Sequence, residues 1–198
     1  MKKHLQIFIL VLFVSLNILG MSTIDLDKSA LSQQDKNAII EQALNLDLPS
    51  TTTVISEEAS KFGTEAIKKV HKGNYEEAIK ITLSGLQKFP KDFNLQSDLA
   101  ALLGDCSEIT PAPLNNRMIE KSKALFDRLL KEADSQPKAA FYPFKNEYYF
   151  RFGMYREQYE LGLKRVADYW GTPEWNSRGF NGYYNQGVGA AHYAKKLL

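Results

Sequence analysis

The sequence predicts an all-α fold built from successive helical hairpins. From Ser56 onward, apolar residues recur at the three- and four-residue spacing of amphipathic helices. One such pattern, at 74–88, is bounded by Gly73 before it and Pro90 after it. The same order of glycine, tyrosine, helical pattern and proline returns at 153–173. Helices this short cannot bury their apolar faces alone, so the repetition indicates hairpins that stack on one another.

The N-terminus, residues 1–22, is typical of a secretory signal peptide. Two lysines precede an apolar run at 5–19, and small residues follow at Gly20 and Ser22. The run is shorter than the about 20 residues that span a bilayer, which favours a cleaved signal and leaves an uncleaved membrane anchor as the alternative. No cysteine follows the run to accept a lipid. We therefore expect a bacterial protein that is periplasmic or secreted, with no membrane span after signal cleavage.

Residues 23–55 form a polar N-terminal segment with one short helix. The helix is expected at 35–48, where Ile39, Ile40 and other apolar residues follow a helical spacing. Pro49 and the threonines that follow it disfavour helix and predict a linker. We expect this whole segment to be loosely docked or mobile, and its role stays open.

The first hairpin has recognisable ends. Ser56 is expected to cap a helix that runs to about Lys72. Gly73 suits the left-handed residue that follows a helix C-terminus. Asn74 is expected to cap the second helix, with Glu77 in the capping-box position three residues on. The proline that follows this helix prevents its continuation.

The remaining helices follow in order along the chain. A third helix is expected at 92–103 and a fourth at 116–133. The long turn between them, 104–115, contains two prolines that disfavour helix. A further hairpin comes next, and one last helix is expected at 182–198. Cys106 is the sole cysteine and can form no internal disulfide, so helix packing must supply the stability, while an intermolecular bridge stays open.

These features resemble the tetratricopeptide repeat. The family's pattern places a bulky residue and small residues in a first helix, an aromatic residue at the start of the second, a small residue one turn later, and a proline at the end. Lys69 and Thr82 depart from it, because an aromatic or larger residue is common at those positions. The residues that match, in order, are Phe62, Ala66, Gly73, Tyr75, Ala78, Gly85 and Pro90.

The resemblance covers residues 56–198 and implies a right-handed α-α superhelix, a solenoid of about three hairpins with a C-terminal capping helix. Gly73 and Gly153 lie 80 residues apart, which is about 12 more than two repeats of about 34 residues. We assign the excess to the long middle turn. The implied repeats are 59–91, 92–137 and 138–173, followed by a half repeat at 182–198.

In repeats of this family the first helix of each hairpin lines a concave groove. The resemblance therefore implies that the groove binds a protein or peptide partner, and its mixture of apolar and polar residues suits an extended peptide or a helix. The carboxylate clamp of one subfamily is absent, because Gly63 and Ile67 occupy its first two positions. The implied groove residues are Thr64, Ile67, His71, Asn94, Ser97, Asp98, Phe144, Glu147, Arg151, Tyr183 and Gln186.

Composition and motifs favour a protein without chemistry of its own. The formal net charge is +2, with basic and acidic residues interspersed, so we expect no nucleic-acid partner. His71 and His192 are far apart and lack neighbouring ligands, so no metal or other cofactor is expected. No nucleophile elbow, phosphate loop or zinc-protease motif is present. The glutamate pairs at 57–58 and 76–77 open helices, where capping explains them.

The C-terminal half is rich in aromatic residues, which supports a second hypothesis. More than half of these rings are expected in the core, and the rest can anchor a partner. The alternative function is a small-ligand or carbohydrate (cell-wall) binding protein, or an enzyme, that uses this half. A structural component of an envelope assembly is a third hypothesis. We favour the exported interaction scaffold, with the partner's identity and the oligomeric state left open.

Overall fold

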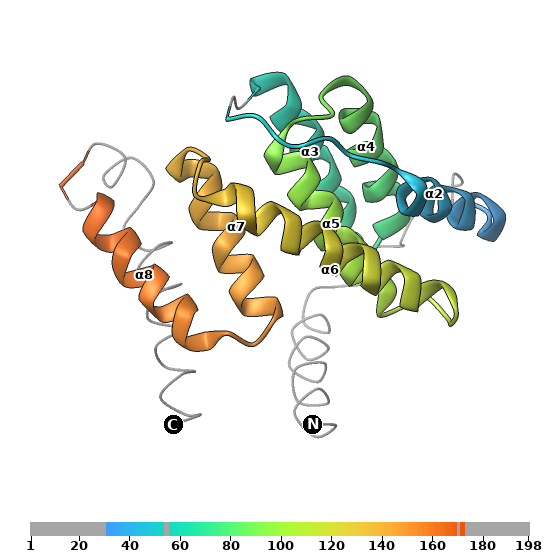
Figure 1. Ribbon diagram of the computed structural model, residues 1–198. Coiled ribbons are helices and arrows are strands. Elements are labelled where there is room, and N and C mark those ends of the chain that lie inside the picture. The colour runs from blue at the N-terminus through green and yellow to red at the C-terminus, as the bar shows by residue number, and fades with distance from the viewer. Residues whose placement is uncertain (1–30, 54–55, 170, 173–198) are drawn as a thin grey trace, which may run out of the picture. The chain divides into compact units, whose positions relative to one another are not determined.

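The computed structural model describes residues 31–53, 56–169 and 171–172, and this part of the chain is all-α. It contains seven helices and no strand, apart from an isolated parallel bridge between Thr52 and Asp92 (Figure 1). All seven belong to the compact unit that begins at Gln33. The all-α prediction is confirmed. The helices are α2 (Gln33–Asn45), α3 (Glu57–Val70), α4 (Tyr75–Lys88), α5 (Phe93–Ser107), α6 (Leu114–Ala133), α7 (Lys138–Arg151) and α8 (Tyr155–Tyr169).

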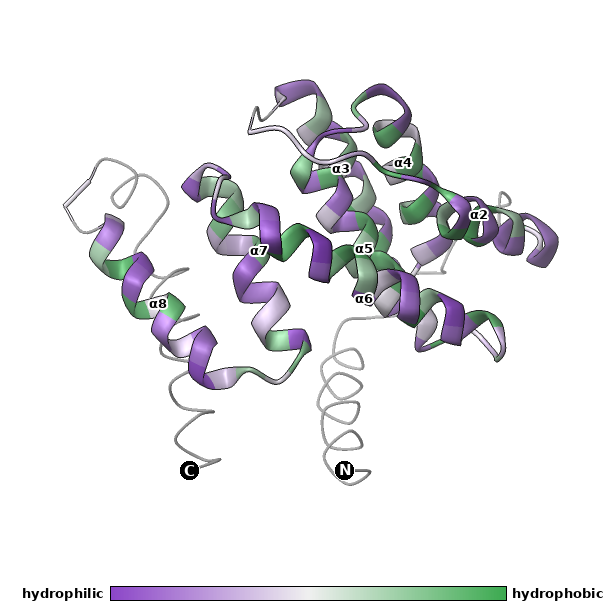
Figure 2. Ribbon diagram, viewed as in Figure 1, coloured by the Kyte–Doolittle hydropathy of each residue, from purple (hydrophilic) through white to green (hydrophobic). Residues whose placement is uncertain are grey.

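From α3 onward, consecutive helices pack as pairs. Helix α3 packs against α4, α5 against α6, and α7 against α8, and each pair also contacts the next. Contacts join α3 to α5 and α5 to α7, so the first helices of successive pairs are neighbours. Apolar and polar residues alternate around these helices (Figure 2), as expected when one side of each is buried. This order of contacts is consistent with an α-α superhelix.

The ends of the first hairpin follow local sequence signals, with one exception. The Ala59 N–H donates to Ser56 Oγ over 3.2 Å, so the expected cap is confirmed. Gly73 has φ of 74°, the left-handed conformation expected at that position. The capping box expected of Asn74 and Glu77 is wrong. The Asn74 side chain makes no cap hydrogen bond, and the Glu77 carboxylate instead pairs with Lys69 Nζ over 2.5 Å.

Small residues let the helices of the first hairpin approach one another. Ala66 and Ala78 are buried, with 2% and 0% of their surface exposed. Gly85 is also buried, and a Cβ placed on it would lie 3.0 Å from Leu95 Cδ1 and 3.0 Å from Phe62 Cβ. A larger residue at Gly85 would therefore push α4 away from both α3 and α5.

The turn expected at 104–115 is shorter than predicted, because α5 continues to Ser107 and α6 begins at Leu114. Gly104 lies inside α5 rather than ending it. A Cβ there would lie 3.0 Å from Arg151 Nη1 and 3.2 Å from Ser122 Oγ, so the absence of a side chain serves helix packing. The extra residues of this hairpin therefore also lengthen its helices. Helices α5 and α6 have 15 and 20 residues, against 14 each in α3 and α4.

Helix α2 is docked on the rest of the fold, so the prediction of a loose or mobile segment is wrong for this helix. It contacts α4 and α6, and it buries Ile40 and Ala43 to 2% and 0% exposure. A salt bridge joins Lys36 to Glu76 of α4. Arg117 of α6 donates two hydrogen bonds to the Glu41 carboxylate, over 2.5 and 2.9 Å. Apolar burial on one side and paired charges on the other keep the helix in place.

The linker after α2 is also held, mainly through its backbone. Lys121 Nζ donates to the Leu46 carbonyl over 2.7 Å, and Arg128 Nη1 donates to the Pro49 carbonyl over 2.8 Å. Glu132 accepts from the Thr51 N–H over 3.0 Å. An extended segment has no helical partners for these groups, so side chains of α6 satisfy them. The sequence predicts the linker from its composition but does not predict this docking.

The buried core runs through the paired helices. It contains Leu99 and Leu103 of α5, Phe126 and Leu129 of α6, and Ile79 of α4, all at 0% exposure. Cys106 is equally buried, and burial raises the pKa of its thiol. A thiol in that position is unreactive and cannot reach a second chain while the protein is folded. The intermolecular bridge that the sequence left open is therefore excluded for the folded chain.

Candidate partner-binding face

The first helices of the three pairs present partly exposed residues that the sequence assigns to a groove. On α3, Thr64 and His71 are exposed and Ile67 is 52% exposed. On α5, the corresponding residues are partly exposed. We call this set the first-helix face. It consists of Thr64, Ile67 and His71 of α3, Asn94, Ser97 and Asp98 of α5, and Glu147 and Arg151 of α7.

Two contacts along one side of α5 join these helices. Towards α3, the Asp98 carboxylate lies against Gly63, where an added Cβ would be 2.8 Å from Asp98 Oδ2. Towards α7, Asp105 accepts from Arg151, with 2.9 Å between Oδ1 and Nη1. Asp98 and Asp105 are seven residues apart and therefore lie on the same side of the helix, two turns from one another. The structure thus brings the predicted residues of α3, α5 and α7 to one connected surface.

Phe144 does not belong to this surface, so its assignment to the groove is wrong. It is 3% exposed. Its ring centroid lies 5.0 Å from that of Phe93 and 5.9 Å from that of Phe126. The residue fills the core between α7 and the preceding pair, where an aromatic ring buries more apolar surface than it would on an open face.

Arg151 lies where the sequence expects it, but its charge is already paired. Besides Asp105, it contacts Glu147 of its own helix, with 2.5 Å between Nε and Oε1. Its guanidinium also lies 5.8 Å from the Phe126 ring centroid. These contacts make Arg151 a link between α5 and α7. Asp105 falls in the turn that the sequence predicts at 104–115, which is why it was not among the predicted residues. It lies seven residues after Asp98, and this helical spacing is the signal that could have found it.

Asp98 differs from the other acidic residues of the face. Burial raises its pKa to about 7, and the negative charge of Asp92 on the same helix adds to the shift. Asp92 itself caps α5, where it accepts from the Leu95 N–H over 3.0 Å. Asp98 has no hydrogen bond or ion pair with any residue in the described part of the chain. The face therefore holds an uncompensated carboxylate between α3 and α5.

Tyr183 and Gln186, the two remaining predicted groove residues, lie outside the described residues. So do His192, the segment 1–30 with its expected signal peptide, and the expected helix at 182–198.

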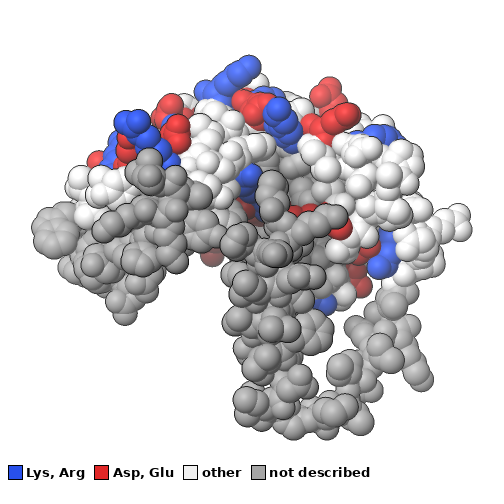
Figure 3. All heavy atoms as spheres, turned by 90° about the horizontal axis from the view of Figure 1, so that it is seen from below, with Lys and Arg blue, Asp and Glu red and all other residues white. Residues whose placement is uncertain are grey.

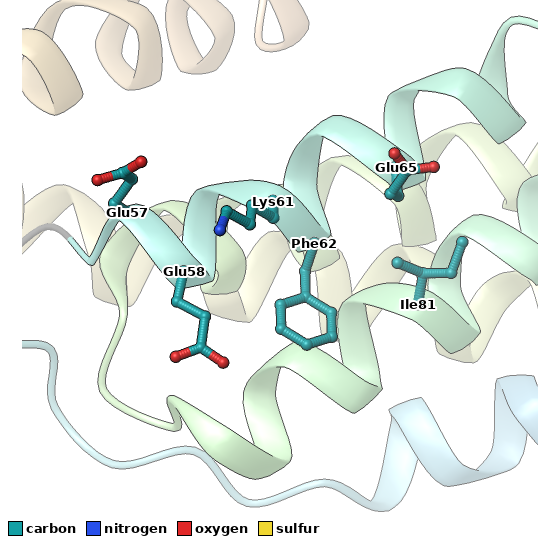
Figure 4. A pocket seen from close by; sticks show the side chains of 6 residues that line it. All are labelled: Glu57, Glu58, Lys61, Phe62, Glu65 and Ile81. Carbon is teal, nitrogen blue, oxygen red and sulfur yellow. The ribbon is translucent and has the colours of Figure 1, made fainter.

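A second surface feature is an open pocket of about 740 Å³ between α3 and α4. Figure 4 shows the Phe62 ring pointing from α3 towards α4, with Ile81 on the facing helix. Lys88 Nζ lies 5.4 Å from the Phe62 ring centroid, and Phe89 packs against the same ring edge-on at 6.4 Å. The Phe62 ring thus packs against other side chains of its own hairpin. The remaining lining residues are Glu57, Glu58, Lys61 and Glu65, which are exposed and carry both signs of charge.

Among the aromatic residues of the described C-terminal half, Phe126, Phe141, Tyr142 and Phe144 are buried, whereas Phe150, Phe152 and Tyr159 are exposed. The expectation that more than half of these rings lie in the core is therefore wrong for the described residues. Phe141 and Tyr142 are buried, and the rings of Phe126, Tyr148 and Phe152 lie 4.7 to 6.2 Å apart. The Tyr142 hydroxyl donates to Asp168 over 2.5 Å and so joins α7 to α8. This bond lowers the pKa of Asp168. Such packing accounts for part of the aromatic composition of this half.

The described residues show neither a metal-binding group nor a helix that could span a membrane. Within them no group of three or more His, Cys, Asp or Glu side chains is placed to hold a metal ion. No helix in the described ranges is both long and apolar enough to cross a membrane. Basic and acidic residues are interspersed on the face that Figure 3 shows, rather than gathered by sign.

Comparison with known proteins assigns no family to the chain. No protein-family model, no curated protein and no solved structure matches it.

Proposed function

We propose that this protein is a tetratricopeptide-repeat-like scaffold that binds a protein or peptide partner on its first-helix face and has no catalysis of its own. The observation that carries the proposal is the connected surface of α3 and α5, whose exposed side chains are not part of the buried core. Ile67 is the clearest case. It is a large apolar residue that is 52% exposed beside hydrogen-bonding neighbours.

The repeat resemblance is supported by two corresponding turns. Gly73 precedes α4 with φ of 74°, and Gly153 precedes α8 with φ of 67°. Each is followed by a tyrosine that begins the second helix of its pair, Tyr75 and Tyr155. Equivalent conformations 80 residues apart favour repeated hairpins. We extend the proposal to a right-handed solenoid on this basis.

The composition of the face suits a peptide-like partner. Asn94 and Ser97 can donate to and accept from a backbone, and Thr64, whose hydroxyl donates to the Ser60 carbonyl over 3.0 Å, can accept. Ile67 supplies apolar contact. An extended segment or an amphipathic helix presents both kinds of group along a line. We therefore favour one of these two forms for the bound partner.

We also propose that the protein is exported through its N-terminal segment and acts outside the cytoplasm. The basic start and short apolar run support this proposal. N-terminal sequencing of the chain recovered from a bacterial periplasm or medium tests it. A new N-terminus near residue 22 is expected, and full-length chain retained in the cytoplasm would contradict export.

A matched pair of isoleucines tests the binding proposal. Ile67 and Ile119 are exposed to 52% and 50%, but Ile67 lies on the first-helix face and Ile119 on α6. A partner is first captured from envelope fractions with the wild-type chain, identified and purified. Its Kd is then measured for the wild type, Ile67→Ser and Ile119→Ser by calorimetry.

We expect Ile67→Ser to weaken binding by about tenfold, because it removes an exposed apolar contact from the face. Ile119→Ser should change the Kd by less than about twofold. Equal Kd values for both variants would move the binding surface elsewhere. Unchanged helicity by circular dichroism is the control for folding.

A further inference from the structure

We propose that Asp98 recognises a positively charged group of the partner, a lysine, an arginine or a terminal amine, which docks between α3 and α5 on the first-helix face. This inference rests on the proposed function and names the chemistry that the face selects. Three properties of the site support it: the position of the carboxylate, the absence of a described counter-charge, and the lack of a structural task for this residue.

The position of the carboxylate is set by the contact of two helices. Gly63 of α3 leaves the space that Asp98 Oδ2 approaches, since an added Cβ would lie at only 2.8 Å. Asp98 remains partly exposed, so its oxygens stay open to a ligand. Thr64 directly follows Gly63 in the chain, and Ile67 lies one turn further along α3 on the same side as Gly63. A ligand that lies along these residues passes the carboxylate.

No described basic group neutralises Asp98. Among the cations on helices that contact α5, Arg151 is paired with Asp105 and Glu147. Arg128 donates to Gln96 and to the Pro49 carbonyl. Lys69 of α3 is paired with Glu77 of α4. Each of these cations is already engaged, and the nearest charge that acts on Asp98 is the like charge of Asp92.

No hydrogen bond or ion pair within the described ranges gives Asp98 a structural role. Asp92 already caps α5 through the Leu95 N–H. Aspartate in the interior of a helix is a poor helix former. An unpaired carboxylate in partly buried surroundings costs free energy of folding, because desolvation disfavours its charge. Groups that cost stability without a packing reason are typical of binding and catalytic sites.

The chemistry of one carboxylate selects a cation over other ligands. An anion would be repelled by Asp98 and Asp92 together. A bound metal ion needs several converging ligands, and the described part of the chain has no such group. An ammonium or guanidinium needs only one carboxylate and restores the charge balance. The side-chain oxygens of Asn94 and Ser97 can accept its remaining hydrogen bonds.

The experiment uses a library of random 12-residue peptides displayed on phage and selected on the whole chain at pH 8. The sequences recovered show whether a basic residue is enriched at one position. A recovered peptide is then synthesised in two forms, one with lysine and one with norleucine at that position. Norleucine keeps the four-carbon chain of lysine and lacks its charged amine.

The Kd of each peptide is measured for the wild type, Asp98→Asn, Ile67→Ser and the control Asp47→Asn, which changes an exposed aspartate beyond the face. We expect Asp98→Asn to raise the Kd of the lysine peptide by about tenfold and that of the norleucine peptide by less than about twofold. Wild-type affinity for the lysine peptide should fall by on the order of tenfold between pH 8 and pH 5.5, because protonation removes the carboxylate charge. Asp98→Asn should lose most of that pH dependence, and Asp47→Asn should behave as wild type.

The outcomes separate the two proposals. Peptides whose binding depends on Ile67 but shows no preference for lysine over norleucine would overturn the role of Asp98 and leave the scaffold function standing. A lysine preference that survives in Asp98→Asn would overturn it equally. If no peptide is enriched, or if binding ignores Ile67, the first-helix face is not the binding surface and both proposals fall.

Discussion

Asp98 lowers the stability of the fold, because its carboxylate is partly buried without a counter-charge among the described residues. Its pKa is 3.8 in an unstructured chain and about 7 in the folded protein. Between these values the folded state holds a proton that the unfolded state has released. The contribution of Asp98 to the free energy of unfolding therefore falls as the pH rises from about 4 to 7, and it is lowest above pH 7.

The first prediction follows from that sign. Asp98→Asn should raise the free energy of unfolding at pH 8 by on the order of 1–3 kcal/mol, because the amide fills the same space without a charge to desolvate. At pH 4 the variant and the wild type should differ little. Urea denaturation at the two pH values measures this. The variant Asp47→Asn is the control, and a gain of the same size at both pH values would contradict the electrostatic explanation.

Gly85 illustrates the opposite kind of residue, one whose small size is required by packing. The second prediction is that Gly85→Val lowers the free energy of unfolding by about 1–3 kcal/mol, because a side chain there collides with Phe62 and Leu95. The exposed neighbour provides the comparison, since Ser84→Val on the same helix should cost less than about 1 kcal/mol. Thermal or urea unfolding of both variants measures the difference. Equal losses of free energy of unfolding would mean that the cost of Gly85→Val comes from helix propensity and not from the contact between helices.

At the scale of whole elements, α2 and its linker are part of the folded unit. The third prediction is that Ile40→Ala lowers the free energy of unfolding by about 2–4 kcal/mol, since it empties a buried site between α2, α4 and α6. Ile67→Ala changes an exposed isoleucine and should cost less than about 1 kcal/mol. Urea midpoints with unchanged m-values would establish both numbers. A negligible effect of Ile40→Ala would mean that α2 is only loosely docked after all.

At the scale of the molecule, burial is unequal along the described chain. Helix α5 buries nine residues, whereas α8 buries Gln158 and Leu161. Arg151 and the aromatic contacts of Phe144 are the main links between α7 and the preceding pair. In stacked helical pairs, stability is roughly a sum of each pair and its interface with the next. The pair α7–α8 is therefore expected to open before α3–α6.

The fourth prediction concerns this opening. Native-state hydrogen exchange should give a lower opening free energy for the amide of Leu161 than for that of Leu99, by at least about 2 kcal/mol. Asp105→Asn removes a partner of Arg151 and should lower the protection of Leu161 while leaving that of Leu99 nearly unchanged. Equal protection at the two amides in the wild type would mean that the described helices unfold as one cooperative unit.

The sequence by itself determined what depends on neighbours along the chain. Local backbone preferences and periodicity predict the Ser56 cap, the left-handed Gly73 and the apolar faces of the helices. These features can therefore be predicted from the sequence alone. Helical spacing also places the predicted residues of α3 on one side of that helix and those of α5 on one side of theirs, whereas the contact of Asp98 with Gly63 joins the two sides. Phe144 was misassigned because periodicity reports that a residue shares a side of its helix, not which neighbour that side meets.

Only the tertiary structure decided the rest. Glu77 turns to Lys69 rather than to a cap, the polar linker is held by Lys121 and Arg128, and Asp105 pairs with Arg151. Each of these contacts joins residues from different elements, and several chemically similar partners compete for each. Their free energies depend on distance, burial and the other charges present, which are properties of the folded arrangement. The lack of a partner for Asp98 among the described residues is known for the same reason, because it depends on how side chains from several helices are arranged.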